Sequence, residues 1–208
     1  MAMMRASRSL KHFQELVEAG SDFPFYGALL YAPVNGLNAK LHEYTKSHWQ
    51  LMDALTGRNC LLLAVEDIDE GPAIEQYRPQ DIYDIARQLG ALVSAIPCII
   101  LFTEPRARNE TLVLRLKEFL GDASDVTDEG LTDFFQSLAA IIDSCSGREQ
   151  NGRLECLRRG LDEEWPPESS WHEDATKATG WIVPSITTAA TVFQAFNTIA
   201  TVIKTVTG

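Results

Sequence analysis

The segment Tyr31–Leu41 (YAPVNGLNAKL) joins an apolar run to a helix-like stretch, and loops in such positions often carry functional groups. Its turn contains Asn35, Gly36 and Asn38 but no ionisable side chain. Amide groups and exposed backbone can bind an extended peptide, but an amide does not act as a nucleophile. Asn-Gly is also a common turn dipeptide and Asn38 would make a good helix N-cap, so a plain structural connection is the favoured alternative.

The four cysteines, Cys60, Cys98, Cys145 and Cys156, show neither the spacing of a metal knuckle nor a C-x-x-C motif. Cys60 and Cys98 lie in apolar runs, which predicts buried side chains. Cys98 directly follows Pro97, so a single-cysteine thiol enzyme is an alternative to a core position. The cysteine pattern favours a reduced chain in the cytoplasm.

An acidic cluster follows the second predicted strand and contributes four carboxylates, Glu66, Asp67, Asp69 and Glu70. Because ligands bind at the carboxyl ends of parallel strands, we expect the cluster to lie beside the Asn turn. Carboxylates can hold a hard cation, but D-x-D without further ligand spacing is more typical of a solvated loop. No phosphate-binding loop or nucleophile elbow occurs, so we predict neither metal nor cofactor.

The charge balance of 18 basic against 29 acidic residues gives a net charge of −11. Sequence-independent attraction to nucleic acid needs clustered Lys and Arg, so we predict no nucleic-acid partner. Contact with an anionic membrane surface would have to be hydrophobic. The N-terminal residues lack the apolar stretch of a secretory signal, and we read them as the basic start of a helix that ends near Gly20.

Hydrophobic patterning predicts an α/β domain over residues 1–150. Buried strands are expected at 25–34, 60–69 and 96–105, and a fourth strand at 110–119 would form a hairpin with the third. Helical spacing is found at 38–57, 79–92 and 127–145. The order is a parallel βαβ half followed by a ββα half around a mixed sheet.

This order resembles the thioredoxin-like fold, in which a W-C-G-P-C turn follows the first of these strands and a cis-proline begins the third. The resemblance covers roughly residues 24 to 145, about the size of one small domain. Pro97 falls at the proline position, with Ile96 and Cys98 beside it. Asn35 and Asn38 fall where the two cysteines would stand. The number of residues between Asn35 and Pro97 in the sequence is larger than is usual for the family.

Three groups that thioredoxin chemistry needs are absent under this alignment. Asn35 and Asn38 replace both cysteines, and Leu29 replaces the buried aspartate that handles protons. The resemblance therefore implies a redox-inactive member, whose vestigial groove comprises Asn35, Gly36, Asn38, Ile96, Pro97 and Cys98.

The residues after the predicted domain differ in character. Residues 151–177 are charged, contain Pro166 and Pro167, and read as a linker with a short helix around 153–161. Between Lys177 and Lys204 there is no charged residue. Apolar residues recur there at helical spacing, which predicts an amphipathic helix at 178–208. Its apolar face comprises Ile186, Ala189, Val192, Phe193, Phe196, Ile199, Ala200 and Ile203.

Three interpretations of this tail remain open. It could dock on its own domain, associate with further copies as a homo-oligomer, or contact a membrane, which its length would allow it to span. Gln194 and Asn197 make a lone membrane span unfavourable.

We predict a non-catalytic binding or regulatory module whose C-terminal helix mediates self-assembly, partner binding or membrane attachment. The alternative is a membrane-active, permeabilising protein whose folded domain restrains the tail. The expected location is cytoplasmic, with membrane association as the alternative.

Overall fold

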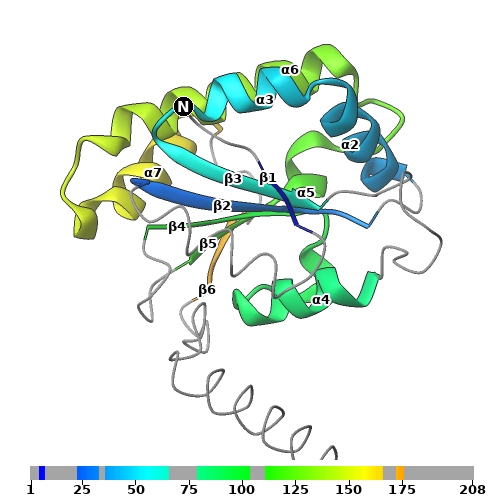
Figure 1. Ribbon diagram of the computed structural model, residues 1–208, viewed down its shortest axis with the longest axis horizontal. Helices are drawn as coiled ribbons and strands as arrows, with labels where there is room; N and C mark the ends of the chain where they lie inside the picture. The colour runs from blue at the N-terminus through cyan, green and yellow to red at the C-terminus, as the bar shows by residue number, and fades with distance from the viewer. Residues whose placement is uncertain are drawn as a thin grey trace, which may run out of the picture.

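A mixed six-stranded sheet forms the centre of the protein in a computed structural model (Figure 1). The structure describes residues 5–7, 23–32, 36–65, 79–103, 111–165 and 172–175. The strands lie in the order β1-β3-β2-β4-β5-β6. Their bounds are β1 Arg5–Ser7, β2 Phe25–Leu30, β3 Cys60–Val65, β4 Cys98–Phe102, β5 Thr111–Arg115 and β6 His172–Ala175.

The strand directions make the sheet mixed. β2 is parallel to β3 and antiparallel to β4, and β4 is antiparallel to β5. These four strands confirm the α/β prediction, and β2, β4 and β5 are shorter than predicted. The edge strands were not predicted: β1 pairs with β3 and β6 pairs with β5. Arg5–Ser7 is a strand and not the start of a helix. The sequence did not predict it, because its pairing partner β3 lies far away in the sequence and local patterns do not report such pairing.

Helices cover both faces of the sheet, so its strands can be apolar on both sides. In Figure 1, α4 (Pro79–Gln88) lies on one face, and α2 (Gly36–Ser47), α3 (Trp49–Thr56), α6 (Asp128–Ser146) and α7 (Gln150–Glu164) lie on the other. Alternate residues of β2 serve the two faces. Phe25 and Leu29 belong to the core under α6 and α7, and Tyr26 and Leu30 belong to the core under α4.

The predicted helix at 38–57 is two helices, α2 and α3, separated by His48. The backbone hydrogen bonds continue across the break, from His48 N–H to the carbonyl of Tyr44 at 2.8 Å and from Met52 N–H to the carbonyl of His48 at 3.0 Å. The hydroxyl of Ser47 donates back to the carbonyl of Glu43 at 2.7 Å. Such back-bonding by serine often bends a helix, and it accounts for the interruption.

The predicted helix at 127–145 is confirmed as α6. Its N-cap is Thr127, whose hydroxyl accepts a hydrogen bond from the N–H of Gly130 at 3.1 Å. The predicted fourth strand ends at Arg115, and the short helix α5 (Leu116–Leu120) follows.

α7 is longer than the short helix expected around 153–161. Its buried residues Leu154, Leu157 and Leu161 lie in the same core as those of α6. The region expected to begin a linker therefore starts with a helix that is packed on the domain.

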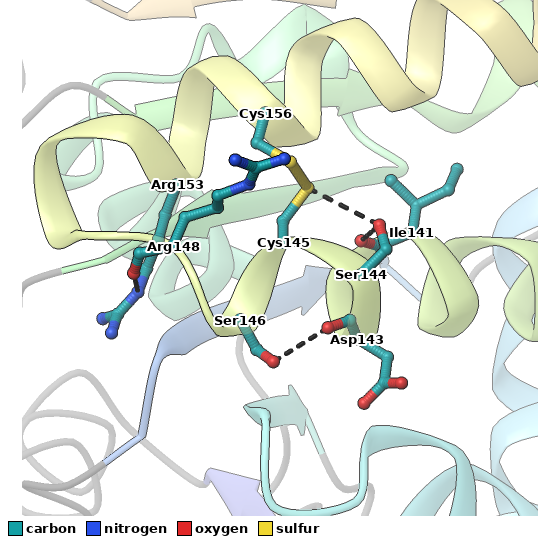
Figure 2. The surroundings of a disulfide bond; sticks show 8 residues. All are labelled: Ile141, Asp143, Ser144, Cys145, Ser146, Arg148, Arg153 and Cys156. Carbon is teal, nitrogen blue, oxygen red and sulfur yellow. Dashed lines mark hydrogen bonds between the residues drawn. A yellow bond between two sulfur atoms is a disulfide. The ribbon is translucent and has the colours of Figure 1, made fainter.

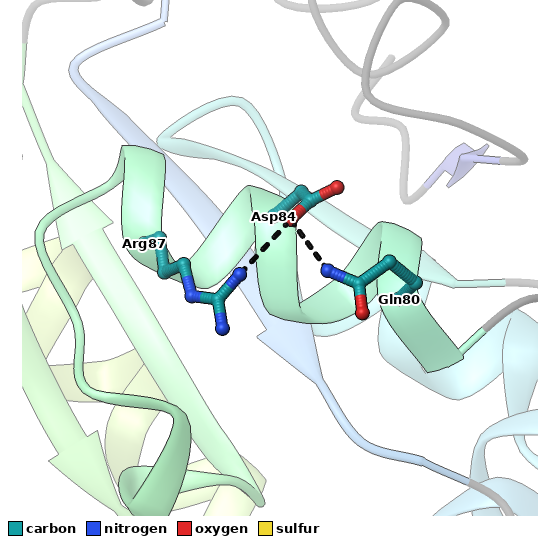
Figure 3. A network of polar contacts seen from close by, with 3 residues as sticks. All are labelled: Gln80, Asp84 and Arg87. Atoms are coloured by element: carbon teal, nitrogen blue, oxygen red, sulfur yellow. Dashed lines mark hydrogen bonds and ion pairs between the residues drawn. The ribbon is translucent and has the colours of Figure 1, made fainter.

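The outer side of α4 carries a small polar network (Figure 3). Asp84 accepts hydrogen bonds from Gln80 at 2.8 Å and from Arg87 at 3.4 Å. Ile82, Ile85 and Ala86 of the same helix are buried. Exposed ion pairs of this kind add little stability, so the apolar residues hold α4 on the sheet.

Candidate functional site

The predicted binding turn lies between β2 and α2. Asn35 lies outside the part of the chain that the structure describes. Gly36 begins α2 with a φ of +56°, a conformation that favours glycine. The Oδ1 atom of Asn38 accepts a hydrogen bond from the backbone N–H of Ala32 at 3.0 Å. Asn38, the third residue of α2, therefore ties the end of β2 to the start of the helix.

Pro97 lies at the same end of the sheet as this turn. The register of β2 and β4 places Leu30 opposite Cys98. The C-terminal end of β2 and the N-terminal end of β4 therefore lie next to each other, at the same end of the sheet. The Ile96–Pro97 peptide bond is cis, and Pro97 is buried. The carbonyl oxygen of Pro97 accepts a hydrogen bond from the N–H of Leu116 at 3.0 Å.

An apolar surface precedes Pro97. Leu92 is 58% exposed and is the only large apolar side chain classed as exposed in the described ranges. Ile96 is partly exposed, and the short 3-10 helix η1 (Val93–Ala95) separates the two residues. A single exposed leucine is common on protein surfaces, so Leu92 by itself does not mark a partner site.

Cys98 is fully buried in the core under α4. A reactive cysteine needs an accessible thiolate in electropositive surroundings. The burial of Cys98 therefore agrees with the core position that the sequence favoured over a catalytic one. Cys60 is also buried, and burial raises the pKa of its thiol to about 12.

An apolar cavity of about 20 Å³ lies between α3, α6 and the sheet. Its lining includes Met52, Cys60, Leu62 and Phe135. Binding sites for small molecules are far larger and have several converging polar groups. This cavity is little more than a space for one water-sized sphere, so we regard it as a packing feature.

Tyr44 holds α2, the helix that begins at the candidate turn, against α6. Its hydroxyl lies 2.9 Å from Oγ1 of Thr132, and its ring stacks on Phe135 with centroids 5.7 Å apart. Burial raises the pKa of Tyr44 and the negative charge of Asp128 raises it further, while the hydrogen bond with Thr132 lowers it. His48 stacks on the same ring at 4.3 Å.

The remaining predicted sites lie outside the described residues. They are the acidic loop at 66–70 and the tail at 178–208 with its apolar face. Their roles in cation binding, assembly or membrane contact stay predictions. Among the helices that the structure describes, none is long and apolar enough to cross a membrane. Within the same ranges, no group of three His, Cys, Asp or Glu residues could hold a metal ion.

A disulfide joins Cys145 in α6 to Cys156 in α7, with Cα atoms 5.7 Å apart (Figure 2). The expectation of reduced cysteines is wrong for this pair. The two residues are 11 positions apart and form no recognised motif. Only the pairing of the two helices brings them together, so the sequence contained no local signal for the bond.

Neither the protein-family models, nor the curated proteins, nor the solved structures contain a match to this chain. The functional proposal therefore rests on where the end of β2, the start of α2 and Pro97 lie.

Proposed function

We propose that the protein is a redox-inactive, thioredoxin-like module that binds an extended segment of a partner protein. This proposal rests on one observation: the connection from β2 to α2 and Pro97 lie at the same end of two neighbouring strands. The described residues before Pro97 offer apolar side chains, Leu92 and Ile96, and the described residues at this end of the strands offer no accessible thiol.

The order and direction of the strands support the thioredoxin-like assignment. β2, α2 with α3, and β3 make a parallel βαβ half. β4, β5 and α6 make an antiparallel ββα half, and β4 pairs with β2. Pro97 directly precedes β4, where the resemblance expects the family's proline.

The chemistry of the site supports a non-catalytic role. Asn38 cannot attack a disulfide, and its Oδ1 atom already accepts a hydrogen bond from Ala32. Leu29, at the position of the family's proton-handling aspartate, is fully buried among apolar residues. Cys98 has no exposed surface in the described structure. None of these three residues can exchange thiols with a peptide.

Leu92 supplies a direct test of peptide binding. Burying a leucine side chain contributes about 1.5 kcal/mol, which corresponds to about a tenfold change in Kd. We therefore expect Leu92→Ser to weaken binding of unstructured, apolar peptides by about tenfold. The measurement is a fluorescence-anisotropy titration of the full chain against a panel of peptides that differ in apolar content.

The matched control is Ala140→Ser, which changes an exposed apolar residue of α6. It should leave the affinity unchanged. A panel in which no peptide binds the wild-type protein, or in which both variants lose affinity equally, would contradict the proposed site.

The assembly part of the proposal rests on the sequence of residues 178–208 alone. Phe193→Asp with Phe196→Asp places charges on the apolar face of this segment, and sedimentation velocity should show a loss of oligomers. Flotation with lipid vesicles distinguishes the membrane alternative. If the wild-type chain floats and the double variant does not, the segment attaches to membranes.

A further inference from the structure

The disulfide between α6 and α7 joins a buried cysteine to a partly exposed one. Cys145 lies in the last turn of α6 and is 1% exposed. Cys156 lies in the second turn of α7 and is partly exposed. A thiolate that approaches from solvent therefore meets Cys156 first.

Gly152 and Gly160 lie four positions before and after Cys156 on α7. Residues four positions apart share a helix face, so both glycines lie on the same face as Cys156. A Cβ atom at Gly160 would lie 2.6 Å from Cγ2 of Ile141, so this glycine allows α7 to pack closely on α6. A Cβ atom at Gly152 would meet nothing within 4 Å. Gly152 therefore places no side chain over the N-terminal side of Cys156.

One arginine side chain reaches the disulfide, and two more arginines lie close to Cys156 in the sequence. The side chain of Arg148 extends toward the disulfide in Figure 2. Arg153, three positions before Cys156, donates from Nε to the carbonyl of Arg148 at 3.0 Å and from Nη1 to the carbonyl of Pro24 at 3.4 Å, and its guanidinium points away from the disulfide. Arg159 lies three positions after Cys156 on the same helix.

The nearest acidic residues offset this charge only in part. Glu155 is paired with Arg158, and Glu149 is exposed at the start of α7. The turn is therefore locally basic in a chain whose net charge is −11. Positive charge next to a sulfur favours the approach of an anionic thiol and stabilises a thiolate there.

We propose that the Cys145–Cys156 pair is a reversible thiol–disulfide exchange site that accepts small anionic thiols at Cys156. The incoming thiolate forms a bond to Sγ of Cys156, and the bond to Sγ of Cys145 breaks, so that Cys145 leaves as a thiolate and takes up a proton. A second thiolate then attacks the sulfur of the bound reagent. This second attack forms the disulfide of the reagent, and Cys156 leaves as a thiolate that takes up a proton. Overall, two thiols are oxidised to one disulfide and the protein disulfide is reduced.

This site is independent of the proposed peptide-binding function, since it lies at the α6–α7 turn and uses none of the residues near Pro97. Leu157 and Leu161 are fully buried and keep α7 docked by packing. Reduction therefore removes a covalent link between two helices without removing the apolar contact between them.

The first test compares three small thiols on the native full-length protein. These are 2-mercaptoethanesulfonate, 2-mercaptoethanol and cysteamine, which are anionic, neutral and cationic, used at equal thiolate concentration and low salt. We expect the anionic thiol to reduce the disulfide about tenfold faster than the cationic one, and high salt to remove the difference. The net charge of the whole chain would produce the opposite order. Fastest reduction by cysteamine, or no reduction without denaturant, would overturn the proposal.

Arg148→Gln tests the source of this preference. It should slow the anionic thiol severalfold and leave the rate with 2-mercaptoethanol unchanged. Arg87→Gln, at an exposed arginine of α4, is the matched control and should change neither rate. Equal slowing by the two variants would contradict the role of the α6–α7 turn.

The choice of sulfur is tested with single cysteine variants and the disulfide of 2-mercaptoethanesulfonate. Cys145→Ser should form a mixed disulfide at Cys156 at least about tenfold faster than Cys156→Ser does at Cys145, because burial protects Cys145. Mass spectrometry of peptides locates the adduct. Faster modification of Cys145 would overturn the assignment. If either variant fails to fold, the series of thiols on the wild-type protein still decides the proposal.

Discussion

Oδ1 of Asn38 and the backbone N–H of Ala32 form a hydrogen bond of 3.0 Å across the turn between β2 and α2. The bond joins a residue of the helix to a buried residue just after the strand. The end of β2 is thus tied to the start of α2 by a polar side chain at one of the two positions where the thioredoxin resemblance expects a cysteine.

Asn38→Ala should destabilise the protein, because it leaves the N–H of Ala32 without its partner. Loss of such a partner costs about 1–2 kcal/mol in the free energy of unfolding. Asn38→Asp keeps an acceptor oxygen and should cost less. Urea unfolding followed by circular dichroism measures both. An alanine variant as stable as the wild type would show that this hydrogen bond does not hold the turn.

The thioredoxin-like alignment itself can be tested by restoring the missing motif. Asn35→Cys with Asn38→Cys creates a C-x-x-C at the start of α2. We expect the pair to form a disulfide in air and to reduce insulin disulfides faster than the wild type, since thiols at a helix N-terminus are activated. Asn35→Ser with Asn38→Ser is the control. Two introduced cysteines that remain unpaired under oxidation would contradict the alignment.

Much of the central sheet was predictable from the sequence because its strands are local apolar runs. The run that contains Cys60–Val65 and the capped helix that starts at Asp128 both have signals within a few residues. The edge strands, the Cys145–Cys156 disulfide and the bond between Asn38 and Ala32 depend on which segments meet in space. Contacts between segments that are distant in the sequence leave no local sequence pattern, so they are seen only in the folded structure.

The two glycines of α7 should respond in opposite directions to substitution by alanine. Gly160→Ala places a methyl group 2.6 Å from Ile141, and overpacking of this kind costs about 1–3 kcal/mol. Gly152→Ala meets no neighbour within 4 Å and should stabilise the helix by up to about 1 kcal/mol. Urea unfolding of both variants under oxidising conditions measures the difference. Equal effects would mean that α7 does not pack on α6 at Gly160.

Stability should fall at alkaline pH partly because of Cys60. Burial raises the pKa of this thiol from 9.0 to about 12 in the folded protein. Above pH 9 the unfolded chain releases the thiol proton while the folded chain keeps it, so the contribution of Cys60 is full below pH 9 and is lost as the pH rises toward 12. The expected slope is about 1.4 kcal/mol per pH unit. Urea unfolding at several pH values should give a shallower loss for Cys60→Ala, and an unchanged slope would contradict this contribution.

The most direct test of the central claim is the reduction of insulin disulfides by dithiothreitol in the presence of the full-length protein. The claim that the thioredoxin-like site is redox-inactive predicts the same rate with the wild type and with Cys98→Ala. A rate accelerated as strongly as by a thioredoxin, and lost in Cys98→Ala, would show that the site is catalytic and would contradict the proposed binding role.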